Sequence, residues 1–384
     1  MNKIIYILLV LIHVSCLAQD EESETVYMSV SPAVDTSDKG ITELIHVVSE
    51  FLRTKNESLT SHPSWLQADF ERYVVPYKDL FKIEQSRWGN NHFRPTLMEV
   101  ITLSSNEKIA KIGFVGYNRE SGENVIRAIY NILAIRVNGV WKLKRLTDYC
   151  TKDWSVFTEG SITYHIPKGK TPDNQEIARQ KEAIREVCLF FETPEVPITY
   201  YSCESLKQIF EIKGFDYLPN MYFDTIGGMV DPGNIVYSGN DSEYYMHEIM
   251  HVYSTTLFPS LPPFLNEGLA TYAGGSGLDN YAKNREYFKL YIQENSIQLA
   301  EHLEPYERLF MRNGTPVPYM IGAVICERVF RVHGKEGLIG LLRSDKELWE
   351  TLNTYGFTQE NLSAEIKKEM ELPGTWLLEK NIVD

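Results

Sequence analysis

The sequence predicts an α+β protein built from two domains. In the first half, helical stretches are followed by long runs of β-branched and aromatic residues that favour antiparallel strands. In the second half, a few short strand-like runs give way to a series of amphipathic or apolar helices. A chain of 384 residues with 43% hydrophobic residues is long enough to form both units and to bury a sizeable core.

The first residues, MNKIIYILLVLIHVSCLAQ, have the features of a secretory signal peptide. Lys3 supplies a positive charge, and the apolar run 4–14 is too short to span a bilayer comfortably. The small residues Cys16 and Ala18 predict cleavage after Ala18, so that 1–18 is the signal peptide and the mature protein is secreted or periplasmic. Lipid attachment at Cys16 is an alternative. No other stretch has the pattern of a transmembrane segment.

The first domain is expected over 41–155. Residues 19–40 are polar and acidic without a period, and they predict a disordered lead. Helical spacing of apolar residues is found over 41–54 and 64–82, and strand-like runs follow over 96–104, 108–117 and 124–137. Asn138-Gly139 predicts a tight hairpin into a last strand. Together these features indicate a small α+β domain with a curved antiparallel sheet.

Turn residues and charges over 150–172 predict a boundary, and a second domain is expected over 170–375. Its predicted strands are 196–203 and 234–238. Its predicted helices are 173–193, 204–214, 242–256, 264–273, 283–294, 319–333 and 347–371.

The segment HEIMH, which lies in one of these helices, carries the pattern H-E-x-x-H. Residues four apart lie on one face of a helix, so His247 and His251 can chelate one metal ion through neutral imidazole nitrogens. The carboxylate of Glu248 can reach a water on that ion without being a ligand. A catalytic zinc site also needs a third protein ligand and an open position for water.

Glu267, in the segment FLNEGLATY, is the candidate third ligand. It lies near the start of the next predicted helix, after a turn that contains Pro262 and Pro263. A helix that returns alongside the first would bring the Glu267 carboxylate to the metal. The alternative interpretation is an acidic residue that merely favours the first turn of a helix.

The combination of HEIMH with FLNEGLA resembles the gluzincin zinc peptidases, whose motif is H-E-x-x-H followed by N-E-G-x-A. The resemblance covers 170–375. It implies Zn²⁺ held by His247, His251 and Glu267, with Glu248 as the general base. It also implies a thermolysin-like catalytic domain, with a small sheet above the active-site helix and a helical lobe below it. The segment ITYYSCESLKQIFEIKG is similar to the entry region of bacterial peptidase-MA-like proteins.

A tyrosine in a PY-x-x-G setting supplies an oxyanion donor in gluzincin aminopeptidases, and the segment VPYMIG resembles that setting. The resemblance makes Tyr319 the candidate donor, with a packing role at a helix start as the alternative reading. Tyr272 is the other candidate.

The segment GGMVDPGNIVYS resembles the edge strand that pairs with substrate in this group. In the aminopeptidase branch, a glutamate of this strand captures the substrate amine, and Val230 stands at its position here. Asp231 could substitute for it, or could be an ordinary turn residue. Endopeptidase and aminopeptidase action both remain open.

In the first domain, VNGVWKLKRL resembles the final hairpin of nuclear transport factor 2-like domains, which implies a cone-shaped fold over 41–150. The net charge of −14 argues against a nucleic-acid partner. The cysteines at 150, 188, 203 and 326 can be free buried thiols or can form disulfides.

These features predict a secreted zinc-dependent peptidase that acts on a peptide or protein. The alternatives are a zinc-containing binding or scaffold protein that uses its first domain to hold a partner, and a zinc hydrolase of a non-peptide substrate.

Overall fold

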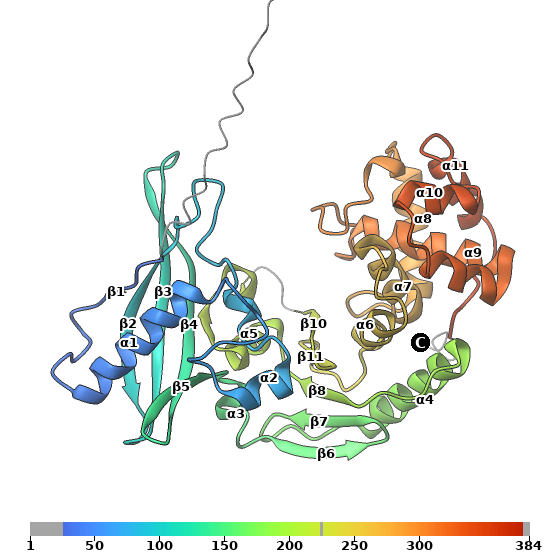
Figure 1. Ribbon diagram of the computed structural model, residues 1–384. Helices are drawn as coiled ribbons and strands as arrows, with labels where there is room; N and C mark the ends of the chain where they lie inside the picture. The colour runs from blue at the N-terminus through green and yellow to red at the C-terminus, as the bar shows by residue number, and fades with distance from the viewer. Residues whose placement is uncertain (1–25, 223–225, 379–384) are drawn as a thin grey trace, which may run out of the picture.

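The computed structural model describes residues 26–222 and 226–378, and it confirms the predicted α+β class. Figure 1 shows a first sheet on the left, a second sheet at the bottom and a helical lobe on the right. The predicted signal peptide lies outside the described residues. Among the residues that are described, no helix is long and apolar enough to cross a membrane.

The first sheet is built mainly from consecutive antiparallel strands, as the long strand-like runs predict. Asn138 and Gly139 both adopt positive φ (51° and 81°), which is the geometry of the hairpin turn expected there. Register shifts in three strand pairs bend the sheet. The strands are β1 (Ser29–Val30), β2 (Arg94–Thr102), β3 (Glu107–Asn118), β4 (Glu123–Val137), β5 (Val140–Lys144) and β9 (Phe215–Tyr217), which pairs with β4.

Helix α1 (Lys39–Thr54) confirms the first predicted helix and packs its buried face on this sheet. Its N-cap is Asp38, whose carboxylate accepts the backbone N–H of Ile41 at 2.9 Å. The predicted helix over 64–82 is wrong. Only α2 (Gln67–Tyr73) and the single turn η1 (Lys78–Leu80) are helical there, because Pro76 and the β-branched pair before it interrupt the pattern.

The predicted disordered lead is wrong for residues 26–40. β1 pairs with β2 in parallel, and the side chains of Val26 and Val34 are buried in the core of the first sheet. The apolar residues here form only a short run before the turn that contains Pro32, which is too little to distinguish a strand from an irregular lead in the sequence. Residues 19–25 lie outside the described residues.

The segment 150–172, which the sequence predicts to be a boundary, contains the last residue of a short helix and a complete β-hairpin. Ile162, Tyr164 and Ile166 alternate with less buried residues, and they place this hairpin in the second sheet. Its strand order is β10-β11-β8-β7-β6. The strands are β6 (Ser155–Glu159), β7 (Ile162–Ile166), β8 (Ile198–Ser202), β10 (Gly228–Asp231) and β11 (Ile235–Ser238), and α3 (Thr147–Cys150) precedes them.

The second sheet is a central layer between two hydrophobic cores. Tyr200 of β8 and Val236 of β11 belong to the core shared with the helical lobe. Their neighbours Tyr201 and Tyr237 point to the other face and join the core of the first sheet. Burial on both faces explains why these strands are continuous apolar runs in the sequence. The two halves of the chain therefore pack on one shared sheet.

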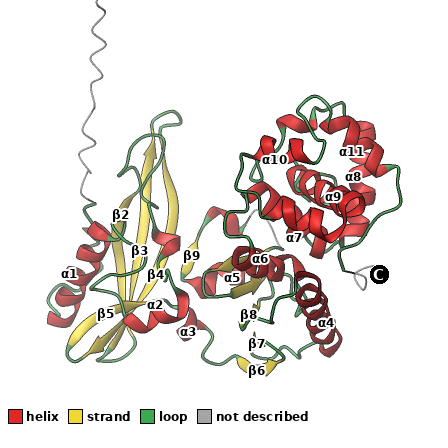
Figure 2. Ribbon diagram, turned by 45° about the vertical axis from the view of Figure 1, so that its right-hand side comes forward, coloured by secondary structure: helices red, strands yellow, loops and turns green. Residues whose placement is uncertain are grey.

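Helices cover the second sheet and form the lobe, and Figure 2 shows α6 where the lobe meets the sheet. The predicted helix over 347–371 is two helices, because Gly356 with φ of 84° follows the first one. The helices are α4 (Asn174–Phe191), α5 (Leu206–Lys213), α6 (Met246–Leu257), α7 (Pro263–Gly274), α8 (Tyr281–Glu294), α9 (Val317–Leu342), α10 (Leu348–Thr354) and α11 (Leu362–Met370).

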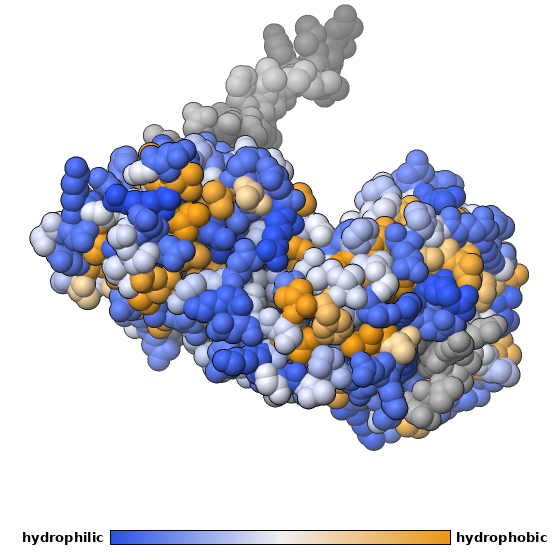
Figure 3. All heavy atoms as spheres, turned by 90° about the horizontal axis from the view of Figure 1, so that it is seen from below, coloured by the Kyte–Doolittle hydropathy of each residue, from blue (hydrophilic) through white to orange (hydrophobic). Residues whose placement is uncertain are grey.

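Seen from below, the surface is mostly hydrophilic, with hydrophobic patches near its middle, and its outline narrows between the first sheet and the lobe (Figure 3). The four described cysteines are free thiols, and Cys203 and Cys326 are fully buried. In this fold the thiols act as small core residues.

Candidate active site

Helix α6 presents His247 and His251 on one face. Its opposite face is fixed by Ile249 and Met250, which are fully buried in the core of the lobe. The two imidazole rings lie one turn apart, with ring centroids separated by 4.9 Å. Core packing on one side of the helix therefore holds both rings toward the other side.

Helix α7 returns alongside α6 and brings Glu267 to the two histidines. Pro263 occupies the first turn of α7, where its missing N–H leaves no helical hydrogen bond unmade. The Glu267 carboxylate oxygen Oε2 lies 3.4 Å from Nε2 of His247 and 3.4 Å from Nε2 of His251. These three side chains offer donor atoms within 4.8 Å of one another, so they could hold a metal ion.

A backbone carbonyl orients the first imidazole. Nδ1 of His247 lies 2.7 Å from the carbonyl oxygen of Gly275, just after α7, so this nitrogen carries the proton and donates it. The other nitrogen, Nε2, faces Glu267, and on metal binding it would give up its proton and offer its lone pair to the ion. Such outer hydrogen bonds fix the tautomer of a ligating histidine.

A second contact ties the two motif helices together. Ser254, on the turn of α6 that follows His251, donates its hydroxyl to Oδ1 of Asn266 at 2.5 Å. Asn266 directly precedes Glu267. The asparagine of FLNEGLA therefore fixes the position of the third candidate ligand.

Burial and opposite charges govern the ionisation of the cluster. Burial alone would raise the pKa of Glu267, but hydrogen bonds from the two imidazoles outweigh it and hold that pKa well below its usual range. Burial would lower the pKa of His251, but the Glu267 carboxylate raises it to about 9. Burial raises the pKa of Glu248, which lies beside the cluster and is 6% exposed.

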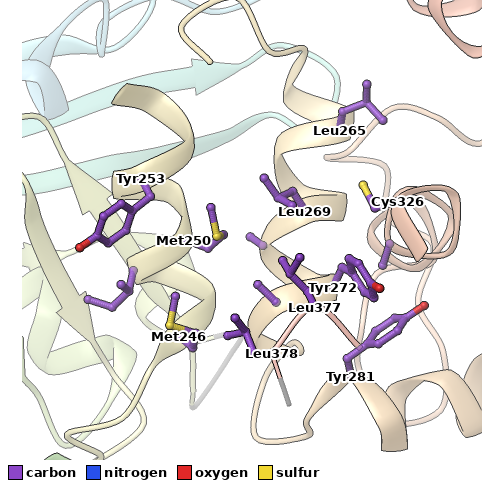
Figure 4. Close-up of a cluster of buried hydrophobic side chains, with 14 of the residues drawn as sticks. Met246, Met250, Tyr253, Leu265, Leu269, Tyr272, Tyr281, Cys326, Leu377 and Leu378 are labelled. Carbon is purple, nitrogen blue, oxygen red and sulfur yellow. The ribbon is translucent and has the colours of Figure 1, made fainter. Parts of the chain in front are cut away.

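Tyr319 lies at the cluster, and Tyr272 does not. The Tyr319 ring stacks against His247 with centroids 6.0 Å apart, and burial together with the Glu267 carboxylate raises the pKa of its phenol. Tyr272 instead points into the lobe core, where it packs on Tyr281 and donates its hydroxyl to the carbonyl of Thr375 (Figure 4). Only Tyr319 of the two lines the cleft.

The cluster opens into a cleft of about 1130 Å³. One wall is β10, the last strand of the second sheet, which pairs only with β11 among the described strands. β10 begins beside the general-base candidate, since a Cβ on Gly228 would come 2.8 Å from Cγ of Glu248. The other walls come from α6, α7 and the segment before α9. An extended chain could lie along β10 and reach the cluster.

Asp231 has neither of the two roles considered from the sequence, which were capture of a substrate amine and an ordinary turn residue. Its carboxylate is buried between Arg145, at 3.0 Å, and Lys213, at 3.1 Å. A carboxylate held by two cations is not available to capture a substrate amine, and it is not an ordinary solvated turn residue. Val230, where the aminopeptidase glutamate would be, lines the cleft.

Three residues that contact the metal cluster or line the cleft have no signal in the sequence. Gly275 supplies a carbonyl whose target depends on how α7 packs on α6. Val74 and Lys78 line the far end of the cleft although they belong to the first half of the chain. A glycine after a helix indicates a cap, but it does not reveal which side chain its carbonyl will contact. The positions of Val74 and Lys78 at the cleft likewise arise from tertiary packing, which the local sequence does not show.

The donor set fits a zinc ion. Two imidazole nitrogens and one carboxylate oxygen match the ligand types of catalytic zinc sites, and the adjoining cleft leaves room for a fourth ligand. The remaining described histidines contribute to no such group. Comparisons with protein-family models, with curated proteins and with solved structures found no match for this chain.

Proposed function

We propose that this protein is a zinc-dependent peptidase. The observation that carries the proposal is the convergence of His247, His251 and Glu267 at the base of an open cleft, with Glu248 beside them. The convergence matters because the three side chains come from two helices separated by a turn, and a chance H-E-x-x-H pattern would not bring in a third ligand. The resemblance to gluzincins supports a thermolysin-like arrangement of this half of the chain.

The chain's residues divide the work. His247, His251 and Glu267 would hold zinc, which when bound acts as a Lewis acid toward water and a carbonyl group. The Glu248 carboxylate would accept a proton from the attacking water and pass it to the leaving nitrogen. The hydroxyl of Tyr319, whose ring stacks against His247, would donate a hydrogen bond to the developing oxyanion.

The cleft geometry supports a peptide as the substrate. No described strand pairs with the outer edge of β10, along the wall nearest to Glu248, and an extended peptide can add to such an edge as a further strand. The sequence pattern of 1–18 supports export, so we propose that the enzyme is secreted or periplasmic.

The test is a digest of a peptide library by the mature chain, read as new termini by mass spectrometry. We expect new termini with the zinc-loaded wild type and a loss of at least ~100-fold with Glu248→Gln, because general-base catalysis contributes about that much. Chelation should abolish cleavage, and zinc should restore it.

Glu286→Gln is the matched control, because Glu286 is an exposed glutamate on α8 away from the cleft. It should cleave like the wild type. Metal analysis should find one zinc per chain and should lose it in Glu267→Ala. Zinc-bound protein whose products equal those of Glu248→Gln would contradict the proposal and favour a binding protein or a hydrolase of another substrate.

A further inference from the structure

The far end of the cleft is built by the first half of the chain. Val74, directly after α2, and Lys78, the first residue of η1, line the same cavity as the turn after β10. At that turn, a Cβ on Gly233 would come 2.8 Å from the carbonyl oxygen of Arg72. The segment 72–79 and the edge strand are therefore in direct contact.

This segment holds a strained backbone. Val74 has φ of 61° and ψ of −51°, and the N–H of Val75 donates to the carbonyl of Tyr73 at 2.6 Å. A β-branched residue rarely adopts positive φ, and a tight turn of this kind is uncommon. The turn leaves Val74 43% exposed at the cavity. Strain of this kind clusters at ligand-binding sites and persists only where the surroundings enforce it.

A cluster of ion pairs holds the end of this segment against the second sheet. Asp79, next to Lys78, lies 3.2 Å from Lys213, and Lys213 also binds Asp231 at the end of β10. Arg145 lies 3.9 Å from Asp79 and 3.0 Å from Asp231. The same charges thus fix the segment 72–79 and the edge strand to each other, so the backbone of Lys78 has a defined place relative to the end of β10.

Lys78 brings an uncommitted positive charge to an otherwise acidic cleft. It is the one lysine or arginine along the described lining, and it is exposed. No ion pair joins it to another described residue, whereas the nearby cations Arg145 and Lys213 are neutralised by Asp79 and Asp231. A free ammonium at the end of a peptide cleft is suited to a carboxylate.

We propose that Lys78 determines specificity by binding an aspartate or glutamate side chain of the peptide substrate. This inference rests on the proposed function. β10 runs from Gly228 beside Glu248 to Asp231 beside the segment 72–79, and a strand rises about 3.3 Å per residue. The acidic side chain therefore lies about three to four residues from the scissile bond.

The test measures binding without hydrolysis. The protein is the full mature chain carrying Glu248→Gln and loaded with zinc. It is titrated with two fluorescent pools of ten-residue peptides, which are random except at one fixed position. One pool has Glu at that position and the other has Lys, and the fixed position is moved along the peptide in successive experiments. We expect at least ~10-fold tighter binding of the Glu pool at one position. Adding Lys78→Glu should reverse that preference, which is the signature of a direct charge contact.

Lys82→Glu is the matched control, because Lys82 is exposed in the following turn but does not line the cleft. It should keep the preference for the Glu pool, and circular dichroism should show all variants folded. Equal binding of the two pools, no binding of either, or an unchanged preference in Lys78→Glu would overturn the inference.

The peptidase proposal fails separately. If the binding assay shows a preference for Glu but the wild type cleaves no peptide, the peptidase proposal is contradicted and the proposed role of Lys78 stands. If the wild type and Lys78→Glu cleave peptides at the same sites, the peptidase proposal stands and the proposed role of Lys78 is contradicted.

Discussion

At the scale of single residues, the candidate metal site depends on a glycine that carries no functional group. Gly275 adopts φ of 80°, and a Cβ there would come 2.1 Å from the carbonyl oxygen of Asp279. Gly275→Ala should shift the carbonyl that accepts Nδ1–H of His247. We expect metal affinity to fall about 10- to 100-fold, as for other second-layer partners of ligating histidines. Competition with a chromogenic chelator measures this affinity.

Gly277→Ala is the control for backbone strain in the same loop. Gly277 also has positive φ, of 65°, but among the described residues only the end of the Ile226 side chain lies within 4 Å of its added Cβ. Comparable loss of metal affinity in both variants would show that loop strain, and not the carbonyl of Gly275, controls the imidazole.

The sequence could predict the candidate site where the geometry is local. His247 and His251 lie one helical turn apart, so their spacing alone puts the histidines on one face. The prediction of Glu267 as the third ligand required knowledge of a motif, because the approach of its carboxylate to the histidines depends on how α7 packs beside α6. Tyr319 was favoured over Tyr272 only by the resemblance of VPYMIG to a known motif, since both tyrosines stand on apolar helices. Packing distinguishes them, because only Tyr319 faces the cleft.

At the scale of elements, two motif glycines set the distance between α7 and α9. A Cβ on Gly268 would come 2.5 Å from the carbonyl carbon of Gly322, so the two backbones touch where these residues cross. Gly268 follows Glu267 in sequence, and Gly322 lies one turn after Tyr319. The contact therefore brings the candidate oxyanion donor toward the candidate ligand.

Gly268→Ala should force α7 and α9 apart. We expect a loss of about 1–3 kcal/mol in the free energy of unfolding, typical of overpacking, together with a fall in peptide cleavage. Urea unfolding and the library digest measure the two effects. Gly340→Ala on α9 is the control, because its Cβ meets only the hydroxyl end of Tyr355. Unchanged stability in Gly268→Ala would contradict a backbone contact.

Elements were predictable where their signal is local and were missed where burial comes from distant partners. The turn at Asn138-Gly139 and the helix at 39–54 carry their own signals. The hairpin of β6 and β7 was hidden between turn residues in a segment that looked like a boundary. β9 is only three residues long and joins the first sheet from the second half of the chain, so no sequence period could reveal its partner.

At the scale of the whole molecule, the two halves of the chain are joined by buried charge as well as by apolar packing. Arg145 follows the last hairpin strand of the first sheet, Lys213 ends α5, and Asp231 ends the edge strand at the cleft. Burial would raise the pKa of Asp231, but Lys213 and Arg145 outweigh it and lower the pKa to about 2. The ionised carboxylate therefore stabilises the folded chain.

The pH dependence of this stabilisation has a definite sign. The pKa of Asp231 in the folded state lies below the ordinary value of 3.8. The ionised carboxylate therefore makes its full contribution to the free energy of unfolding above about pH 4, and this contribution is lost as pH falls toward 2. Asp231→Asn removes the same charge at every pH and leaves two buried cations less compensated. We expect it to cost about 3 kcal/mol of unfolding free energy at pH 7.

The difference between wild type and Asp231→Asn should narrow as pH falls from about 4 to 2, because the wild-type carboxyl then takes up the proton that the amide mimics. Urea unfolding followed by tryptophan fluorescence over this pH series measures it. Asp345→Asn, at an exposed site, should show no such trend. A difference that stays constant down to pH 2 would mean that Asp231 contributes by shape and hydrogen bonding alone. The trend would instead show that one ionised carboxylate links the first sheet to the wall of the cleft.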